Sequence, residues 1–400
     1  MLVVHKYGGT SVGDVERIEN VTNRVAKARE NGNDVVVVVS AMSGETNKLI
    51  GYAEHFTKDP AKKEMDMLLS SGERVTAALL SISLQARGYD AVALTGRQAG
   101  ILTDDTHTYA RIESIDPKAV TDAIAEGKIV IVAGFQGINK SGAVTTLGRG
   151  GSDLSAVALA AAINADQCEI YSDVDGIYTT DPRIEPKAKK LNTISYDEML
   201  ELSSLGAKVL QNRSVELAKK LNVKLYAKSS FSDDVGTLIA EESSMEAVLV
   251  SGIVLDKNQA RVTLRGVADR PGIAADIFVK LAEENINVDM IIQNMGTDGS
   301  TNLGFTVPLS EHENAKKVME SFDHEFEGMD FDENVCKVSV VGVGMKSHAG
   351  VAAAAFTAMA QQNINIQMIS TSEIKVSMVI DEKYGELAIR TLHEAYGLDK

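Results

Sequence analysis

The first 240 residues alternate between short apolar runs and longer stretches with helical spacing. Runs such as DVVVVVSA and KIVIVAGF are rich in Val, Ile and Ala, and amphipathic segments follow them. Continuous apolar runs between helices are typical of parallel strands that helices cover on both faces. The pattern therefore predicts an α/β domain over residues 1–240 with a mainly parallel central sheet.

Two local predictions follow from the same pattern. The region that includes LLSSGERVTAALLSISLQAR is expected to be a long helical region. The alanine-rich helix after GRGGSD is expected to begin at Asp153, with Ser152 or Asp153 available as its N-cap. Composition becomes polar and small at residues 240–247, which indicates the end of the domain.

The rest of the chain contains an internal repeat. The segment that starts with VTLRGVADRPG at Val262 matches the one that starts with VSVVGVGMKSHAG at Val338, once two extra residues are allowed in the second loop. Each copy reads strand, glycine-containing loop, helix, Asn-Ile-Asn turn and two strands. Two small α+β modules are therefore predicted. The repeat alone is equally compatible with two structural modules that pack as a dimer interface.

Composition narrows the function classes. The chain has 400 residues, 44% of them hydrophobic, and a formal net charge of −16, so a folded protein is expected and duplex nucleic acid is not an expected partner. The apolar runs are too short to span a bilayer, and the start of the chain lacks a signal-peptide pattern, which favours a cytoplasmic location. Cys168 and Cys336 are expected to be packed thiols, and the histidines show no ligand spacing.

The stretch GRGGSD combines a cation, two glycines and an anion at a helix start. Unpaired N–H groups and the helix dipole favour an anion there, and Gly150 and Gly151 let a ligand approach the backbone. KYGGTS, from Lys6, is a second glycine-rich turn between strand and helix, which suits a polyphosphate. Neither stretch has the spacing of a Walker A loop or a dinucleotide fingerprint.

Two further stretches carry polar residues beside apolar ones. YSDVDGIYTTDPR follows a predicted strand, and its Asp-Gly and Asp-Pro pairs alone would explain it as a loop. SSGERV places Glu73 in the first turn of a helix, where a glutamate is commonly just favourable with the dipole.

Together with VVVSAMSGETN and GAKVL, these motifs resemble the aspartate kinase (aspartokinase) family, and the repeat resembles its paired ACT regulatory domains. The resemblance covers essentially the whole chain and is closest to the monofunctional enzymes. It implies a three-layer amino-acid-kinase domain over 1–240 and ferredoxin-like ACT domains over 261–335 and 336–400. Residues 241–260 are then expected to form a linker and the first strand of a second ACT domain that is split around the first.

The activity implied by the resemblance is transfer of a phosphoryl group from ATP to L-aspartate, at the start of lysine, threonine and methionine synthesis. A carboxylate with a pKa of about 4 is ionised at neutral pH, so no general base is needed. That fits the absence of histidine from the motifs. The remaining tasks are to bring two anions together and to stabilise the charge on the transferred group.

Roles are implied residue by residue. Lys6 would contact the transferred phosphoryl group and Asp153 would orient Lys6, which makes these two the catalytic pair. The implied nucleotide-binding residues are Lys6, Gly8, Gly9, Ser11, Ser152, Ser172, Asp173, Tyr178, Arg183 and Lys208. The implied aspartate-binding residues are Ser40, Thr46, Glu73, Arg149 and Gly150. Mg²⁺ is expected to be held mainly by the ATP phosphates, with no metal site formed by the protein alone.

The ACT domains imply feedback inhibition by lysine, threonine or both, and a homodimer or homotetramer formed through these modules. The implied effector-binding residues are Asp269, Gly272, Ala274, Gln293, Asn365 and Ile366. The second loop has Lys346 and His348 where the first has an aspartate, so an equivalent second effector site is not expected.

Two alternatives stay open at this point. A kinase of the same fold could act on another carboxylate, such as glutamate or N-acetylglutamate. A non-catalytic amino-acid sensor could retain the fold and lack the chemistry. The pair of Glu73 and Arg149, suited to the two charges of a free amino acid, and the paired ACT modules argue against the first. The intact Lys6, Asp153, Arg183 and Lys208 argue against the second.

Overall fold

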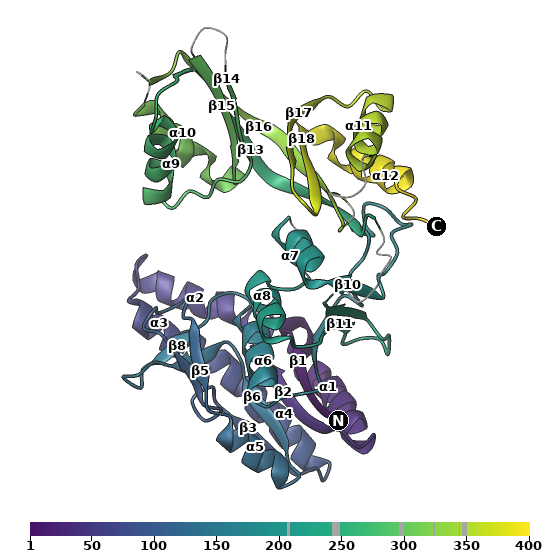
Figure 1. Cartoon of the computed structure of the whole chain (residues 1–400). Helices are drawn as coiled ribbons and strands as arrows, with labels where there is room; N and C mark the ends of the chain where they lie inside the picture. Colours follow the sequence, from purple (N-terminus) through teal and green to yellow (C-terminus); the bar gives the residue numbers. More distant parts are fainter. Residues whose placement is uncertain (206–208, 242–248, 296–299, 323–324, 344, 346–349) are drawn as a thin grey trace. The chain divides into compact units, whose positions relative to one another are not determined.

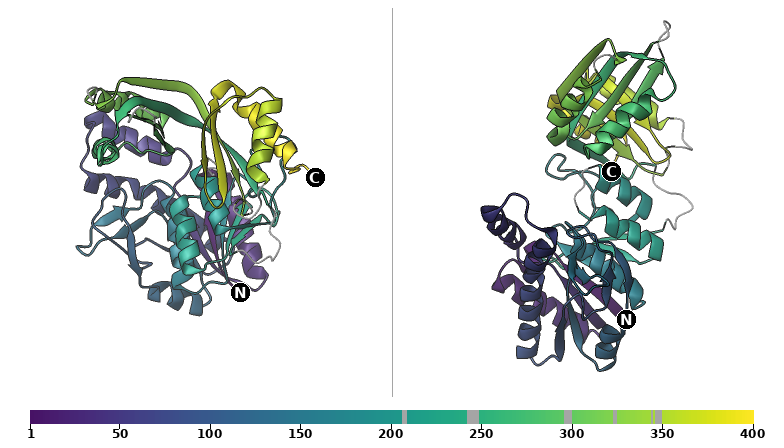
Figure 2. Two further views of the ribbon diagram at one scale, coloured as in Figure 1. Left: turned by 45° about the horizontal axis from the view of Figure 1, so that its top comes forward. Right: turned by 90° about the vertical axis from the view of Figure 1, so that its left-hand side faces the viewer.

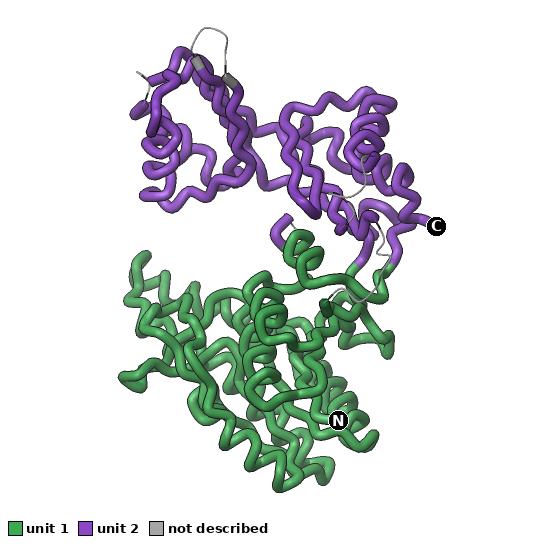
Figure 3. Tube along the Cα trace, viewed as in Figure 1, with its two compact units in different colours: residues 1–177, 190–203, 208–243 green, residues 178–189, 204–207, 244–400 purple. Residues whose placement is uncertain are grey.

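The computed structural model describes residues 1–205, 209–241, 249–295, 300–322, 325–343, 345 and 350–400. The chain divides into two compact units (Figure 3). The first unit comprises residues 1–177, 190–203 and 208–243, and the second comprises residues 178–189, 204–207 and 244–400. The chain therefore passes between the units more than once.

The first unit is an α/β domain. In the described part of the chain its main sheet has eight strands, in the order β10-β12-β11-β9-β1-β2-β6-β3, and only the β11–β12 pair is antiparallel. The strands up to residue 240 are β1 (Leu2–Tyr7), β2 (Asp34–Val39), β3 (Ala91–Leu94), β4 (Ile101–Thr103), β5 (Ile112–Ile115), β6 (Ile129–Ala133), β7 (Gln136–Ile138), β8 (Val144–Thr146), β9 (Gln167–Ser172), β10 (Thr193–Ser195), β11 (Leu225–Ser229) and β12 (Thr237–Ala240). The helices are η1 (Gly9–Val12, 3₁₀), α1 (Val15–Glu30), α2 (Glu45–Phe56), α3 (Lys62–Leu69), α4 (Ser71–Ala86), α5 (Lys118–Ala125), α6 (Gly151–Ala162), α7 (Tyr196–Ser204) and α8 (Asn212–Leu221).

Helices cover both faces of this sheet, so the predicted three-layer domain is confirmed (Figure 1). Successive side chains of a strand point to opposite faces. Val3 and Tyr7 of β1 therefore pack in one core with α1 and α4, together with alternate residues of β2 and β6. The face that carries Lys6 lies against α6, which contacts β1, β2 and β9.

A second, smaller sheet of the first unit has the strand order β5-β4-β7-β8. Its strand β8 ends at Thr146, four residues before the N-cap of α6 at Gly150. The small sheet therefore determines where the GRGGSD stretch begins.

The expected long helical region is present as three helices, α2, α3 and α4. Pro60 lies between the first two, and at the second break the Ser70 hydroxyl donates to the Met67 carbonyl. The second local prediction is wrong. The helix expected from Asp153 begins at Gly151 instead. Its N-cap is Gly150, whose φ of 76° lies in the left-handed region that glycine adopts without strain.

The second unit contains both copies of the predicted repeat. Its described strands form a six-stranded sheet in the order β14-β15-β13-β16-β18-β17, antiparallel throughout. The strands are β13 (Gly252–Ala268), β14 (Ile291–Met295), β15 (Ser300–Val307), β16 (Gly328–Val341), β17 (Ile366–Thr371) and β18 (Lys375–Asp381). The helices are α9 (Ile273–Glu283), η2 (Leu309–Glu311, 3₁₀), α10 (His312–Glu320), α11 (Val351–Gln361), η4 (Glu382–Tyr384, 3₁₀) and α12 (Gly385–Ala395).

Each copy has its own core, and the two long strands run through both. One core joins α9 and α10 to β13 and β15, and the other joins α11 and α12 to β13, β16 and β18 (Figures 1 and 2). Residues 252–256 of β13 pair with the end of β16 in the second copy, whereas residues 260–268 pair with β15 in the first. The aligned Asn285 and Asn363 have φ of 59° and 55°, a left-handed conformation that asparagine tolerates at helix ends.

The stretch 178–189 packs within the second unit although it lies far upstream in the sequence. The N–H of Ile253 in β13 donates to the Thr179 carbonyl (2.8 Å), and Thr179 Oγ1 lies 2.9 Å from His393 Nε2 in α12. Arg390 donates to the Ile184 carbonyl (3.4 Å), and Ile184 contacts the apolar core of the second copy. These bonds hold the stretch against β13 and α12.

None of the described helices combines the length and the apolar composition that a membrane span requires. Cys168 and Cys336 are free and buried, as expected.

Candidate active site

The carboxyl ends of neighbouring parallel strands form the edge at which the predicted motifs meet. Lys6 is in register with Val38 of β2 and with Ile170 of β9. Beyond the strand, the Gly8 N–H donates to the Tyr171 carbonyl (3.1 Å) and the Ser40 N–H donates to the Tyr7 carbonyl (3.1 Å). Ligands of open parallel sheets bind at this edge.

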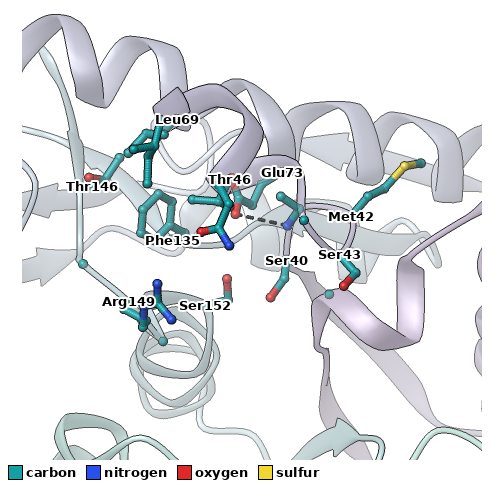
Figure 4. Close-up of a pocket in the computed structure, with 18 of the residues that line it drawn as sticks. Ser40, Met42, Ser43, Thr46, Leu69, Glu73, Phe135, Thr146, Arg149 and Ser152 are labelled. Carbon is teal, nitrogen blue, oxygen red and sulfur yellow. Dashed lines mark hydrogen bonds between the residues drawn. The ribbon is translucent and has the colours of Figure 1, made fainter. Parts of the chain in front are cut away.

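A cavity of about 370 Å³ opens here (Figure 4). Eight residues that the sequence predicted for the site line it: Lys6, Gly9, Ser40, Thr46, Glu73, Arg149, Gly150 and Ser152. The remaining lining residues are Ala41, Met42, Ser43, Gly44, Asn47, Ile50, Leu69, Thr108, Phe135, Thr146, Gly148 and Gly151. The motifs from four separate parts of the sequence therefore surround one space of small-molecule size.

Lys6 and Asp153 form an ion pair across the space between β1 and α6. The Lys6 Nζ lies 2.6 Å from Asp153 Oδ1, and only 10% of each side chain is exposed. Asp153 is in the first turn of α6, so the helix fixes the carboxylate and the carboxylate fixes the ammonium group. The pair fixes the Lys6 ammonium group at the edge of the cavity, in a position to bind an anion.

Glycines shape the loop that carries Arg149. Gly148 has a φ of 81°, and a Cβ there would lie 2.5 Å from the Tyr109 ring. A Cβ on Gly150 would lie 2.6 Å from Gln211 Cγ. These glycines are thus needed for close packing as well as for access to the cavity.

Glu73 is buried beside the cavity, with 4% of the residue exposed. Its Oε1 accepts a hydrogen bond from the Ala41 N–H (3.1 Å), whereas Oε2 has no partner among the described residues (Figure 4). Burial raises the pKa of Glu73 to about 7, although the N–H groups of Glu73 and Ala41 oppose the shift. A buried carboxylate oxygen without a donor is unusual and is suited to a cationic ligand.

Several predicted nucleotide-binding residues lie outside the cavity lining. Ser11 is 1% exposed, and its hydroxyl donates to Ser230 Oγ (2.8 Å). Ser172 ends β9 at the same sheet edge as Lys6, and Asp173 follows it on the surface. Gly8 lies beside the lining residue Gly9 in the chain.

The other three do not place a nucleotide at the cavity. Tyr178 and Arg183 are part of the second unit, where the exposed Arg183 guanidinium pairs with the Asp181 carboxylate (2.7 Å). Lys208 lies outside the described residues. Their assignment to a nucleotide stays a prediction.

The predicted effector loop of the first ACT copy has the expected local form. Gly272, with a φ of 98°, is the N-cap of α9, while Asp269 is exposed and Ala274 lies in the first turn. Gln293 on β14 donates to Thr301 Oγ1 of the neighbouring strand (3.5 Å).

Asn365 and Ile366 belong to the second copy, where Ile366 begins β17. In the strand order, β14 and β17 are at opposite ends of the sheet. No contact described in this chain joins Gln293 to either residue, so their shared effector pocket stays a prediction. Lys346 and His348 of the second loop lie outside the described residues.

Sequence reasoning missed several lining residues from the segments between the motifs. Phe135 follows β6, and Thr108 and Thr146 belong to the small sheet and its connections. Thr108 and Phe135 have φ of 68° and 69°, which only a few per cent of residues other than glycine adopt. Local sequence gives no signal for these positions, because neither residue type favours the left-handed conformation.

The comparisons with known proteins agree with this geometry. The model of the amino acid kinase family matches residues 1–229, and an ACT domain model matches residues 262–321 and 338–396. The aspartokinase of Helicobacter pylori is 58% identical over 405 residues, which cover 100% of both chains. The aspartate kinase of Pseudomonas putida is 54% identical over 402 residues, which cover 100% of this chain and 98% of its own. The chain belongs to the aspartokinase family.

A solved structure extends this result to the fold of the family. The crystal structure of E. coli aspartokinase III in complex with aspartate and ADP has a TM-score of 0.80 and 25% identity to this chain, with 99% of both chains covered. The predicted fold, an amino-acid-kinase domain followed by two ACT domains, is confirmed. So is the predicted class of enzyme, an aspartokinase.

Proposed function

We propose that the chain transfers the γ-phosphoryl group of ATP to the β-carboxylate of L-aspartate, which gives 4-phospho-L-aspartate and ADP. The observation that carries this proposal is the set of charges around one cavity: the Arg149 cation, the spare oxygen of Glu73 and the buried pair of Lys6 and Asp153. In addition, aspartokinase III of E. coli has been crystallised with aspartate and ADP.

A free amino acid has an ammonium group and an α-carboxylate next to each other. In the proposed complex the ammonium group lies at Glu73 Oε2, and the Arg149 guanidinium binds the α-carboxylate with two parallel hydrogen bonds. Ser40 and Thr46 line the same cavity and offer hydroxyl groups to the remaining polar atoms.

The β-carboxylate is the nucleophile in this reaction, and one of its oxygens forms the new bond to the γ-phosphorus as the bond to the ADP oxygen breaks. Because that carboxylate is ionised at neutral pH, no residue has to remove a proton. The Lys6 ammonium group stabilises the negative charge on the transferred phosphoryl oxygens, and Asp153 keeps it in place. Gly8 and Gly9 are proposed to let the phosphates approach the backbone. The Gly8 N–H already donates to the Tyr171 carbonyl, so the Gly9 N–H is the one proposed to bind them.

Magnesium is proposed to bind with ATP and to reduce the repulsion between the two anions. Among the described residues, the one group of three side chains that could hold a metal ion by itself is His312, Glu313 and Glu333, in the second unit. Within the part of the chain that the structure describes, Glu73 is the one carboxylate that lines the cavity. This donor set fits an ion that is held mainly by phosphate oxygens.

The remaining parts of the proposal concern the nucleotide and regulation. Ser172, Asp173, Tyr178, Arg183 and Lys208 are proposed to contact ATP. Lysine, threonine or both are proposed to inhibit through the ACT domains, and aspartokinase III of E. coli has been crystallised with lysine and aspartate. The reaction is proposed to be the first step of lysine, threonine and methionine synthesis. The enzyme is proposed to act in the cytoplasm as a homodimer or homotetramer.

The test is release of ADP by the purified chain with Mg-ATP and L-aspartate, L-glutamate or N-acetyl-L-glutamate. Turnover with aspartate alone is the expected result. Turnover with another acid would replace the proposed acceptor. No turnover with any acid, from folded protein that still binds an amino acid, would instead support the sensor alternative. Each reaction is repeated with lysine and with threonine to identify the effector.

Lys6→Met serves as the control for contaminating kinases. It removes the charge that stabilises the transition state, so kcat is expected to fall about 100- to 1,000-fold. The KM for aspartate is expected to change much less, because Arg149 and Glu73 are intact. Activity in this variant well above that residual level does not come from the proposed site.

A further inference from the structure

Asp66 is a fully buried carboxylate for which the proposed mechanism has no use. It lies on α3, and 0% of the residue is exposed. The Thr108 N–H donates to both oxygens (3.0 and 3.2 Å), the Thr146 hydroxyl donates to Oδ1 (2.5 Å), and His107 Nδ1 lies 2.6 Å from Oδ2. The Asp66 carboxylate therefore links α3 to the connection after β4 and to the end of β8.

Two of these partners line the cavity. Thr108 and Thr146 both face it, as does Leu69 at the end of α3. Thr108 has a φ of 68°, which is rare for a β-branched residue and persists only where the surroundings enforce it. Hydrogen bonds from its N–H to both oxygens of Asp66 hold the backbone in this conformation.

The same elements lead to Arg149. Thr146 is separated from Gly148 by one residue, and the Gly148 Cα packs against Tyr109 and the Thr108 carbonyl so closely that a Cβ would lie 2.5 and 3.4 Å from them. The Ala110 N–H donates to the Thr146 carbonyl (2.9 Å). A shift of the 107–110 segment would therefore move the loop that carries Arg149.

Arg213 on α8 reinforces this arrangement from another side. Its guanidinium donates to the carbonyls of Leu147 (2.7 Å) and Ala110 (2.9 Å) and lies 4.6 Å from the centre of the Tyr109 ring. Asp66 and Arg213 thus both hold the segment 107–110 against the segment 146–148.

We infer that Asp66 is a positioning residue for the acceptor half of the site. It keeps Thr108 in its left-handed conformation and fixes the end of β8, so that Arg149 is held at the distance from Glu73 that an amino-acid substrate requires. The inference rests on the proposed function only for the identity of that substrate.

The main test is Asp66→Asn, measured with saturating and varied concentrations of each substrate. An amide has one acceptor oxygen, and its NH₂ group would face donors in the buried site. The KM for the acceptor is expected to rise about tenfold or more, because small misplacements of binding groups are costly. The KM for ATP is expected to stay within about twofold.

Tyr196→Phe is the matched control. Tyr196 is 2% exposed, lies in the first unit outside the cavity lining, and donates to the Val223 carbonyl (2.6 Å). Loss of the Tyr196 hydroxyl group removes a buried hydrogen bond and is expected to lower the melting temperature. The KM for the acceptor is expected to be unchanged. If Asp66→Asn and Tyr196→Phe change the KM for the acceptor and the KM for ATP to the same extent, the inference is overturned and Asp66 only stabilises the fold.

A double variant separates positioning from general stability. Glycine adopts the left-handed conformation without strain, so Thr108→Gly removes the need for Asp66 to enforce it. The rise in acceptor KM caused by Asp66→Asn is expected to be about threefold smaller in the Thr108→Gly background. The same rise in both backgrounds would contradict the proposed coupling.

Two further outcomes are covered. If Asp66→Asn does not fold, the test uses His107→Ala instead. This change removes a partner of the Asp66 carboxylate that does not line the cavity, and an unchanged acceptor KM in the folded variant would overturn the inference.

The acceptor used in these tests is whichever of the three acids the wild-type chain phosphorylates. If it phosphorylates none, the proposed function fails, and calorimetry of acid binding replaces the KM; a wild type that binds none overturns both proposals.

Discussion

Two buried glutamates of the first unit, Glu73 and Glu169, have the same side chain and opposite surroundings. They are 4% and 5% exposed. The Glu169 oxygens accept hydrogen bonds from Gln167 (2.7 Å), Lys228 (2.8 Å) and the Tyr171 hydroxyl (2.5 Å). Glu73 has one backbone donor and one oxygen with no partner among the described residues. Burial alone therefore does not distinguish a structural carboxylate from one proposed to bind a ligand, whereas the number of its hydrogen-bond donors does.

The largest expected effect is on the stability provided by Glu169. Glu169→Gln leaves the Lys228 ammonium group, whose side chain is 19% exposed, without its anion. Breaking a buried ion pair in this way is expected to lower the free energy of unfolding by about 3 kcal/mol. Urea denaturation measures the loss. A change in the KM for aspartate above twofold would place Glu169 in the functional site and remove the contrast with Glu73.

The reciprocal change is Glu73→Gln. The amide keeps the shape of the side chain but lacks the charge that the substrate ammonium group would meet. The KM for aspartate is expected to rise about 100-fold, equivalent to about 2.7 kcal/mol, while the KM for ATP is unaffected. Steady-state kinetics tests this, and N-acetylaspartate, which has no ammonium group, is the matched ligand: its inhibition constant should differ little between the two proteins.

The pKa of about 7 for Glu73 predicts how aspartate binding depends on pH. Below that value the side chain is neutral, and above it the carboxylate is charged and attracts the ammonium group. Between pH 8 and pH 6, kcat/KM for aspartate is therefore expected to fall about tenfold, since this ratio reports the free enzyme. Glu73→Gln should abolish the dependence, and an unchanged profile in that variant would assign the titration to another group.

The smallest expected effect comes from Tyr171→Phe. It removes one of the donors to Glu169 but leaves Lys228 and Gln167 in place. The free energy of unfolding is expected to fall by about 1 kcal/mol, with kcat and both KM values unchanged. A loss as large as that of Glu169→Gln would show that the donors act as one unit rather than as separate contacts.

The sequence predicts one part of this site well. The strand-to-helix turn after Lys6 predicts that this residue lies at the carboxyl edge of the parallel sheet. Glu73 on α4 and Arg149 after β8 are assigned to the same site only by the family resemblance, and both line the cavity. The repeated Asn285 and Asn363 likewise predict the ends of α9 and α11. In these places a local pattern is enough.

Other features depend on contacts between distant segments. Thr108 and Phe135 take a conformation that their residue types disfavour, and tertiary contacts impose it. Asp66 reads as one more charge in an amphipathic helix, although its partners lie 41 to 80 residues away. The donors around a buried carboxylate come from several elements, so neither glutamate could be assigned its surroundings from the sequence.

The stretch 178–189 has a consequence for any attempt to cut this chain into parts. It carries Tyr178 and Arg183, but the bonds of Thr179 to Ile253 and His393 come from beyond residue 240. A gene truncated after Ala240 encodes every residue proposed to bind aspartate or ATP. It deletes β13 and α12, which hold the stretch that carries Tyr178 and Arg183. Deletion of the ACT domains to relieve the proposed feedback is therefore expected to weaken the proposed ATP binding as well, whereas substitution of the proposed effector residue Asp269 leaves that support intact.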